Sequence, residues 1–248
     1  MGFWVALQFL TIFPVPRRFI AKMEHVGESV VYFPIIGLII GIILALLSIA
    51  LSYVFPRQIV SVLLVIALAV LTGAHHIDGV ADTFDGIIAG KSKAERMTIM
   101  SDTKIGTFGI TAIALVLLFK YSTLVVTGGI QPLILMTVLS RWSMVSILFM
   151  FNSAKKSGMG FAYKQGATWQ RFLMATIITL LIAIVLSGWN GLILIMLIWL
   201  LSFGIGKWVQ SRIDGITGDT CGALNEINEA MTLLFIVCIS TIERLYFG

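Results

Sequence analysis

The chain has 248 residues, of which 58% are apolar and 12% are charged, and its mean hydropathy is +1.02. A typical soluble domain is about 25% charged and 45–50% apolar, so this composition excludes an ordinary soluble protein, a disordered chain and a disulfide scaffold. Long Leu and Ile runs, without alternating strands of ~10 residues, exclude a transmembrane barrel. Because a span needs ~20 apolar residues, we predict an all-α, polytopic membrane helix bundle of about seven transmembrane helices.

A short apolar stretch, residues 3–13, opens the chain and is followed by Pro14, Pro16 and two arginines. No basic residue precedes this stretch, so it does not have the pattern of a cleavable signal. We expect an N-terminal interfacial helix in which four apolar side chains face lipid: Phe3, Trp4, Leu7 and Phe9.

Apolar runs follow in chain order, and each is expected to be a transmembrane helix. They are residues 29–55, 59–71, 105–127, 132–151, 172–187, 191–206 and 230–242. Gly37 and Gly41 lie four residues apart in the first run, a spacing that favours close helix–helix contact. Glycine is also frequent in membrane helices in general, so both interpretations stay open at this point.

Three polar stretches, residues 75–104, 152–171 and 207–229, fall on one side of the membrane if every apolar run crosses it. These stretches and the N-terminal segment hold thirteen of the 17 Lys and Arg residues, which predicts that they are cytoplasmic loops. Eleven of the twelve acidic residues share that side. We therefore expect one domain over residues 1–248, with the N-terminus and any active site on the cytoplasmic side.

The first polar stretch carries Asp78, Asp82 and Asp85 at positions i, i+4 and i+7, within roughly 60° of one another on a helical face. Two carboxylates ~6 Å apart repel by about 3 kcal/mol at an effective dielectric of 20, so a bound cation is expected. Oxygen ligands favour Mg²⁺, or Mn²⁺, over zinc. The alternative is a solvated acidic loop whose aspartates cap helices. The helical projection also puts His75, and not His76, on the aspartate face.

Basic residues follow this cluster, among them Arg96 and Lys104. Lys and Arg beside an acid–metal cluster are typical of phosphate chemistry, although the positive-inside rule alone also accounts for such residues. Lys120 and Arg141 lie within apolar runs, where a charge costs ~2.5–3.5 kcal/mol at mid-span. We interpret Arg141 as a phosphate-binding group, whereas Lys120 could snorkel to the interface.

A second acidic group consists of Asp219, Glu226 and Glu229, which share one side of a helix that begins at about residue 219. The residues Thr217 to Thr220 are typical of a tight loop that opens a helix, and the free N–H groups of such a helix favour an anion. The alternative is that Thr217 or Asp219 is a plain helix N-cap.

Residues 73–86, 102–109 and 217–229 resemble segments of the cobalamin synthase family, which are integral-membrane adenosylcobinamide-GDP ribazoletransferases. Residues 13–16 and 33–37 resemble further segments of this family, so the resemblance covers nearly the whole chain in the same order. The histidine of the family corresponds to His76. Lys104 stands where arginine is frequent and Asp214 where glycine is, so the resemblance does not extend to those two positions.

The resemblance implies a membrane transferase that joins α-ribazole, or its 5′-phosphate, to adenosylcobinamide-GDP. GMP is released, and the product is adenosylcobalamin or its 5′-phosphate, formed in the inner membrane of a prokaryote. The expected cofactor is Mg²⁺, held by Asp78, Asp82 and Asp85. The expected catalytic residues are Asp82, Asp85, Asp219 and Glu226. The expected substrate-binding residues are His76, Arg96, Lys104, Arg141, Thr217 and Glu229.

Two other functions are compatible with the pattern. The acidic pattern is similar to that of the CDP-alcohol phosphotransferases, but Asp82 stands where those enzymes have arginine. A cation transporter is disfavoured because no acidic residue is expected at mid-span in a broken helix. Besides the substrates, the lipid bilayer is the expected partner and nucleic acid is not. A homo-oligomer and association with other cobalamin-pathway enzymes stay open.

Overall fold

The computed structural model describes residues 1–15 and 23–246, and nearly all of its regular structure is helical, which confirms the all-α prediction. Pro16 and the arginines after it lie outside these residues. The elements are α1 (Gly2–Leu10), η2 (Met23–Tyr32), α2 (Phe33–Ser52), α3 (Arg57–Leu71), α4 (His75–Phe84), η3 (Asp85–Ala89), α5 (Lys93–Ile99), α6 (Thr107–Thr127), α7 (Ile130–Met150), α8 (Met159–Gly166), α9 (Trp169–Ile213) and α10 (Gly218–Tyr246).

Six helical segments of the described residues are long and apolar enough to cross a membrane. They are Val26–Ser52, Thr107–Thr127, Ile130–Met150, Trp169–Ser187, Trp189–Ile213 and Gly218–Tyr246. A seventh candidate is a pair, α3 with α4 and η3, bent by 90°. The prediction of about seven spans is therefore confirmed. The chain turns between α3 and α4 at Gly73 (φ 62°) and Ala74 (φ 57°), and α9 breaks at Gly188 (φ 54°).

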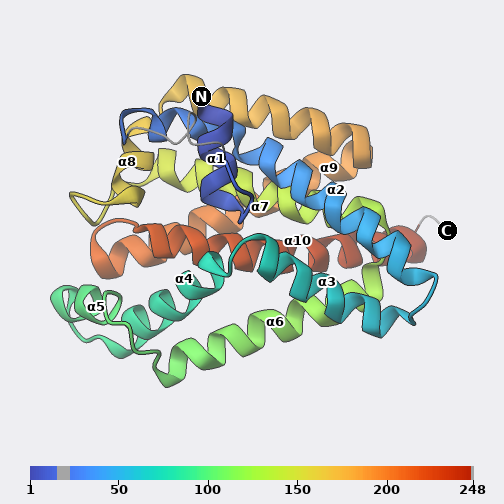
Figure 1. Cartoon of the computed structure of the whole chain (residues 1–248), viewed down its shortest axis with the longest axis horizontal. Coiled ribbons are helices and arrows are strands. Elements are labelled where there is room, and N and C mark those ends of the chain that lie inside the picture. Colours follow the sequence, from blue (N-terminus) through green and yellow to red (C-terminus); the bar gives the residue numbers. More distant parts are fainter. Residues whose placement is uncertain (16–22, 247–248) are drawn as a thin grey trace.

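The connections between the long helices gather at the two ends of the bundle (Figure 1). The α2–α3 and α6–α7 turns, the break in α9 and the C-terminus lie at one end. The helices α5 and α8 and the start of α10 lie at the other end. This separation puts the three polar stretches at a common end of the molecule.

Most of each polar stretch is helical. The helix that carries Asp78 and Asp82 and the helix from about residue 219 were expected, whereas α5 and α8 were not. Residues 75–104 contain α4, η3 and α5, and residues 152–171 contain α8. In the third stretch, only residues 214–217 lie between α9 and α10. The physical reason is that polar side chains such as Asn225 and Glu226 are buried against polar partners, so a helix can be polar there without facing water.

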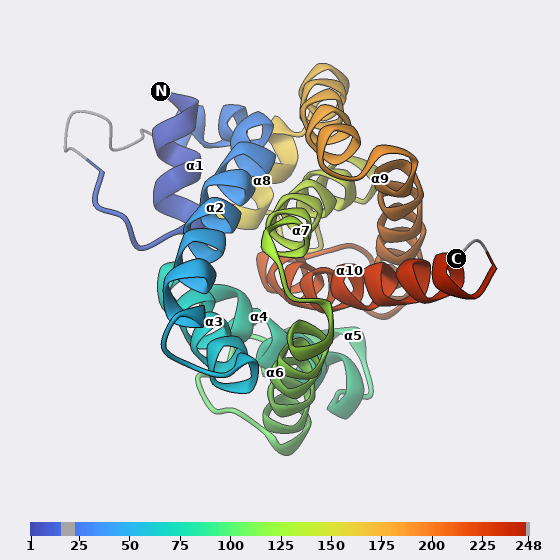
Figure 2. The ribbon, with the colours of Figure 1, turned by 90° about the vertical axis from the view of Figure 1, so that its right-hand side faces the viewer.

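The N-terminal helix α1 also differs from its expected placement. It ends at Leu10, and Leu7 is buried instead of facing lipid. Phe9 stacks on Phe33 with ring centroids 5.9 Å apart and lies 4.4 Å from the ring of Tyr163. Figure 2 shows α1 beside α2. Packing on the protein buries these rings as well as lipid would, and the sequence alone could not distinguish the two environments.

Helix α7 forms the centre of the bundle, with α2, α9 and α10 around it (Figure 2). Gly37 and Gly41 of α2 face α7, and a Cβ added at Gly41 would lie 2.6 Å from the Cα of Ile134. The close-contact interpretation of this glycine pair is therefore correct, because only glycine lets the two backbones approach so closely.

We predict that Gly41→Ala destabilises the bundle, because α2 must move away from α7 to make room for the methyl group; overpacking of this kind costs about 1–3 kcal/mol. The matched control is Gly204→Ala in α9, where an added Cβ meets nothing within 4 Å. Thermal unfolding in detergent should show a lower Tm for Gly41→Ala and no loss for Gly204→Ala. Equal Tm values for the two variants would contradict this packing.

Candidate active site

A cavity of about 700 Å³ lies between the start of α4, the start of α10, the segment that leads into α8, and α1. Its polar side is formed by His75, His76, Asp78, Lys155, Thr217 and Asp219. This volume is within the ~300–1,000 Å³ range of small-molecule sites. The cavity therefore joins residues from both acidic segments of the sequence.

Backbone contact between α4 and α10 brings the two acidic segments together. A Cβ added at Gly79 would lie 2.6 Å from the carbonyl oxygen of Asp219, and one added at Gly222 would lie 3.2 Å from the Cα of His76. Glycine is thus needed at position 79, and position 222 leaves little room for a larger residue. The consequence is that Asp78 and Asp82, on α4, lie next to the first turn of α10.

The charges around Asp82 are mostly negative. Within residues 1–15 and 23–246, its half-buried carboxylate is within electrostatic range of Asp78, Asp219 and Asp85, and of the cation Lys155. The Lys155 Nζ lies 3.5 Å from Asp219 Oδ2. Asp82 itself is not among the residues that line the cavity, whereas Asp78, Asp219 and Lys155 are. A single ammonium does not neutralise several carboxylates, so this edge of the cavity favours the binding of a further cation.

The N-terminus of α10 is closed by reciprocal hydrogen bonds. The backbone N–H of Thr220 donates to the Thr217 hydroxyl (3.2 Å), and the N–H of Thr217 donates to the Thr220 hydroxyl (2.8 Å). The Thr217 hydroxyl donates to Asp219 (3.2 Å). Thr217 and Gly218 line the cavity, so the positive end of the α10 dipole faces it and favours an anion such as phosphate.

The structure places Asp85 elsewhere. Its buried carboxylate accepts hydrogen bonds from the backbone N–H groups of Gly106 (2.7 Å) and Gly109 (2.9 Å). It therefore fixes the start of α6 and does not line the cavity. The segment from Asp102 to Gly109 that resembles the family thus acts, in part, as the binding partner of Asp85.

Two of the expected phosphate-binding residues also lie away from the cavity lining. The guanidinium of Arg96, on α5, donates to the carbonyl of Arg212 at the end of α9 (3.1 Å). Lys104 is exposed in the segment between α5 and α6. The structure does not bring either residue into the same cavity as Asp78 and Asp219.

The remaining expected residues form an ionic cluster inside the bundle. Lys120 Nζ lies 2.6 Å from Glu226 Oε2 and also pairs with Glu229, which pairs in turn with Arg141. All four side chains are buried, and their two positive and two negative charges balance, as buried charges require. The Asn225 amide donates to Nδ1 of His76 (3.0 Å), so His76 links the cavity to this cluster.

Sequence analysis missed part of the cavity, namely the segment 153–161. Lys155 and Gly160 line the cavity, and a Cβ added at Gly160 would lie 2.7 Å from the backbone nitrogen of Gly218. An isolated bridge between Ser153 and Ile216 holds this segment beside α10. The sequence signal for this segment was the basic, glycine-containing stretch 152–171. Its charges were used only to predict how the chain is oriented in the membrane.

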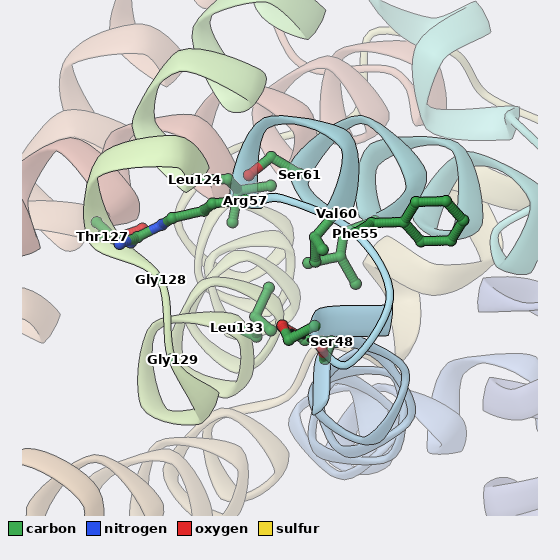
Figure 3. A pocket seen from close by; sticks show the side chains of 12 residues that line it. Ser48, Phe55, Arg57, Val60, Ser61, Leu124, Thr127, Gly128, Gly129 and Leu133 are labelled. Atoms are coloured by element: carbon green, nitrogen blue, oxygen red, sulfur yellow. Dashed lines mark hydrogen bonds between the residues drawn. The ribbon is translucent and has the colours of Figure 1, made fainter. Parts of the chain in front are cut away.

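A second cavity, of about 440 Å³, lies at the opposite end of the bundle and is shown in Figure 3. Arg57 reaches along its wall and donates to the carbonyl oxygen of Val126 at the end of α6 (2.9 Å). No carboxylate lines this cavity among the described residues. It therefore has a cation, Arg57, but not the carboxylates that line the cavity at the α4–α10 crossing.

Within residues 1–15 and 23–246, no three His, Cys, Asp or Glu side chains form a group that could hold a metal ion by themselves. A membrane-spanning bundle whose cavity joins carboxylates, a lysine and a helix N-terminus has the features of a membrane enzyme that acts on phosphate esters. Residues 2–237 match the model of the family described as cobalamin-5-phosphate synthase. The chain belongs to this family.

Curated relatives agree with this assignment. The chain is 37% identical over 230 residues to the adenosylcobinamide-GDP ribazoletransferase of Roseiflexus sp. (strain RS-1), covering 92% of this chain and 86% of the relative. It is 33% identical over 239 residues to the protein of that name from Geotalea daltonii, covering 96% and 97% of the two chains. No solved structure matches the chain.

The ionic cluster gives a stability prediction. Lys120→Met leaves two buried glutamates with one cation, and breaking a buried pair costs about 3–5 kcal/mol. The double variant Lys120→Met/Glu226→Gln removes the unpaired charge and should recover part of this loss in the free energy of unfolding.

The matched control is Lys93→Met, which removes an exposed pair with Asp214 (2.7 Å) and should cost at most ~1 kcal/mol. The free energy of unfolding of all three variants can be measured in mixed micelles. The paired arrangement would be contradicted if Lys120→Met left the free energy of unfolding unchanged, or if the double variant were less stable than Lys120→Met alone.

Proposed function

We propose that the cavity at the α4–α10 crossing is the active site of an adenosylcobinamide-GDP ribazoletransferase. The family model and the curated relatives give this activity. The observation that carries the location is that Asp82, Asp219 and Lys155, from three separate parts of the chain, act on one another beside the N-terminus of α10.

The reaction is a displacement at phosphorus. A ribose hydroxyl oxygen of α-ribazole, or of its 5′-phosphate, attacks the phosphorus on the cobinamide side of adenosylcobinamide-GDP. A new P–O bond forms, the bond to GMP breaks, and GMP leaves with the electron pair. In-line geometry requires the acceptor and the GMP to lie on opposite sides of the reacting phosphorus.

The residues of the cavity suit the parts of this reaction. The first turn of α10 and the ammonium of Lys155 would bind the diphosphate. Asp219 lines the cavity and would accept the proton of the attacking hydroxyl. Glu226, another of the expected catalytic residues, is paired with Lys120, which favours Asp219 as the proton acceptor.

We propose that Asp78 and Asp82 would hold Mg²⁺. Asp219, the proposed proton acceptor, lies beside them. The donors fit this ion, because Mg²⁺ is usually bound by one or two carboxylates together with substrate phosphates and waters, and so needs no complete protein cage. The surplus of negative charge around Asp82 supports the same conclusion. When bound, Mg²⁺ would neutralise charge on the diphosphate and on the departing GMP; Mn²⁺ has similar chemistry.

We also propose that this site faces the cytoplasm, in the inner membrane of a prokaryote. The three polar stretches hold ten of the 17 Lys and Arg residues, and they lie at the same end of the bundle as the start of α10 (Figure 1). The positive-inside rule favours the cytoplasm for that end, where nucleotide substrates are available.

Asp82→Asn tests the acid cluster. We expect GMP release from adenosylcobinamide-GDP and α-ribazole to fall at least ~100-fold at saturating Mg²⁺, because a charged group at the metal and phosphate site is lost. EDTA should abolish the activity of the parent protein, and added Mg²⁺ should restore it.

The control variant is Asp102→Asn, an exposed carboxylate that accepts a hydrogen bond from the backbone N–H of Lys104 (3.1 Å) and does not line the cavity. It should keep nearly full activity. Near-normal turnover by purified Asp82→Asn would overturn the role of the acid cluster.

A further inference from the structure

The lining of the cavity contains two chemically different groups of residues. Those of α4, Lys155 and the start of α10 are charged or polar, as described above. The second group, which we call the apolar wall, consists of Val5, Phe9, Val26, Met144, Phe161 and Tyr163. The helix α1 thus contributes directly to the cavity, through Val5 and Phe9.

The rings of the apolar wall are held in fixed positions. Tyr163 is only 3% exposed. Its ring lies 4.4 Å from that of Phe9 and 5.5 Å from that of Phe33. Such a set of packed rings is suited to a flat aromatic group that enters the cavity and stacks or packs edge to face.

The wall offers few hydrogen-bonding groups. The uncharged polar side chains of the lining include Gln8, on the same helix as Phe9, and Ser153 and Ser157, on the segment that carries Lys155. A guanine base carries several donors and acceptors on its edges, and burying them without partners costs free energy. A benzimidazole-type base has a largely apolar outline, so it suits this wall better.

We infer that the apolar wall binds the aromatic base of α-ribazole, and that Phe9 of α1 is a specificity-determining residue for that base. This inference rests on the proposed function. It is also compatible with the displacement, because a base bound at the apolar wall leaves the charged lining residues free to bind the diphosphate. The volume of about 700 Å³ suits a nucleoside-sized molecule, so the corrin ring would lie outside the wall.

The test is steady-state kinetics of the purified full chain, with each substrate varied at saturation of the other. Phe9→Ala should raise the KM for α-ribazole about 10-fold and change the KM for adenosylcobinamide-GDP less than ~2-fold. Phe9→Tyr, which keeps the ring, should restore most of the affinity. Phe9→Leu, which keeps most of the apolar volume but removes the ring, should behave like Phe9→Ala.

The matched control is Phe3→Ala, which removes a half-buried ring of α1 that contacts Tyr32 and Trp4 and does not line the cavity. Its KM for α-ribazole should be unchanged. If Phe9→Ala instead raises the KM for adenosylcobinamide-GDP, or if Phe3→Ala gives the same effect, the inference is wrong. If the parent protein releases no GMP from these substrates, the proposed function itself fails, and the inference fails with it.

Discussion

The crossing of α4 and α10 is the contact on which the rest of the site depends. Gly79 and Gly222 let the two backbones meet, and each helix carries its acidic residues within a few positions of that contact. A side chain at Gly79 would collide with the backbone of Asp219 and force α4 away from α10. The diphosphate site, the proton acceptor and the metal ligands proposed above all require that these carboxylates stay close.

Burial of charge explains why the helices that build the site are polar. Helix α10 begins at the cavity, where it carries Asp219, and continues into the bundle, where it carries Glu226 and Glu229. The deeper glutamates are matched by Lys120 and Arg141. Among the residues that the structure describes, Lys155 is the cation that acts on the acids at the cavity. Positive and negative charges balance in the interior, as in a structural ion cluster. At the cavity the negative charges are in excess, as in a site that binds cations.

Much of this could be predicted from the sequence, because hydropathy and spacing are local signals. The spans, the helix that carries Asp78 and Asp82, and the α10 helix from about residue 219 follow from such signals. Tertiary contacts decided the rest. Apolarity could not show whether Phe9 faces lipid or protein. Counting charges could not show that Lys155, among the lysines, lines the cavity. The pairing of Arg141 with Glu229 was also hidden, since the partners are 88 residues apart.

The most direct test of the central claim is a double-mutant cycle between Asp82→Asn and Asp219→Asn, measured as kcat/KM for GMP release. If the two carboxylates act in one site, the double variant should be little slower than the slower single variant, because each substitution already disables the same unit. Losses that multiply in the double variant would mean that the two residues act independently, and would contradict a single site at the α4–α10 crossing.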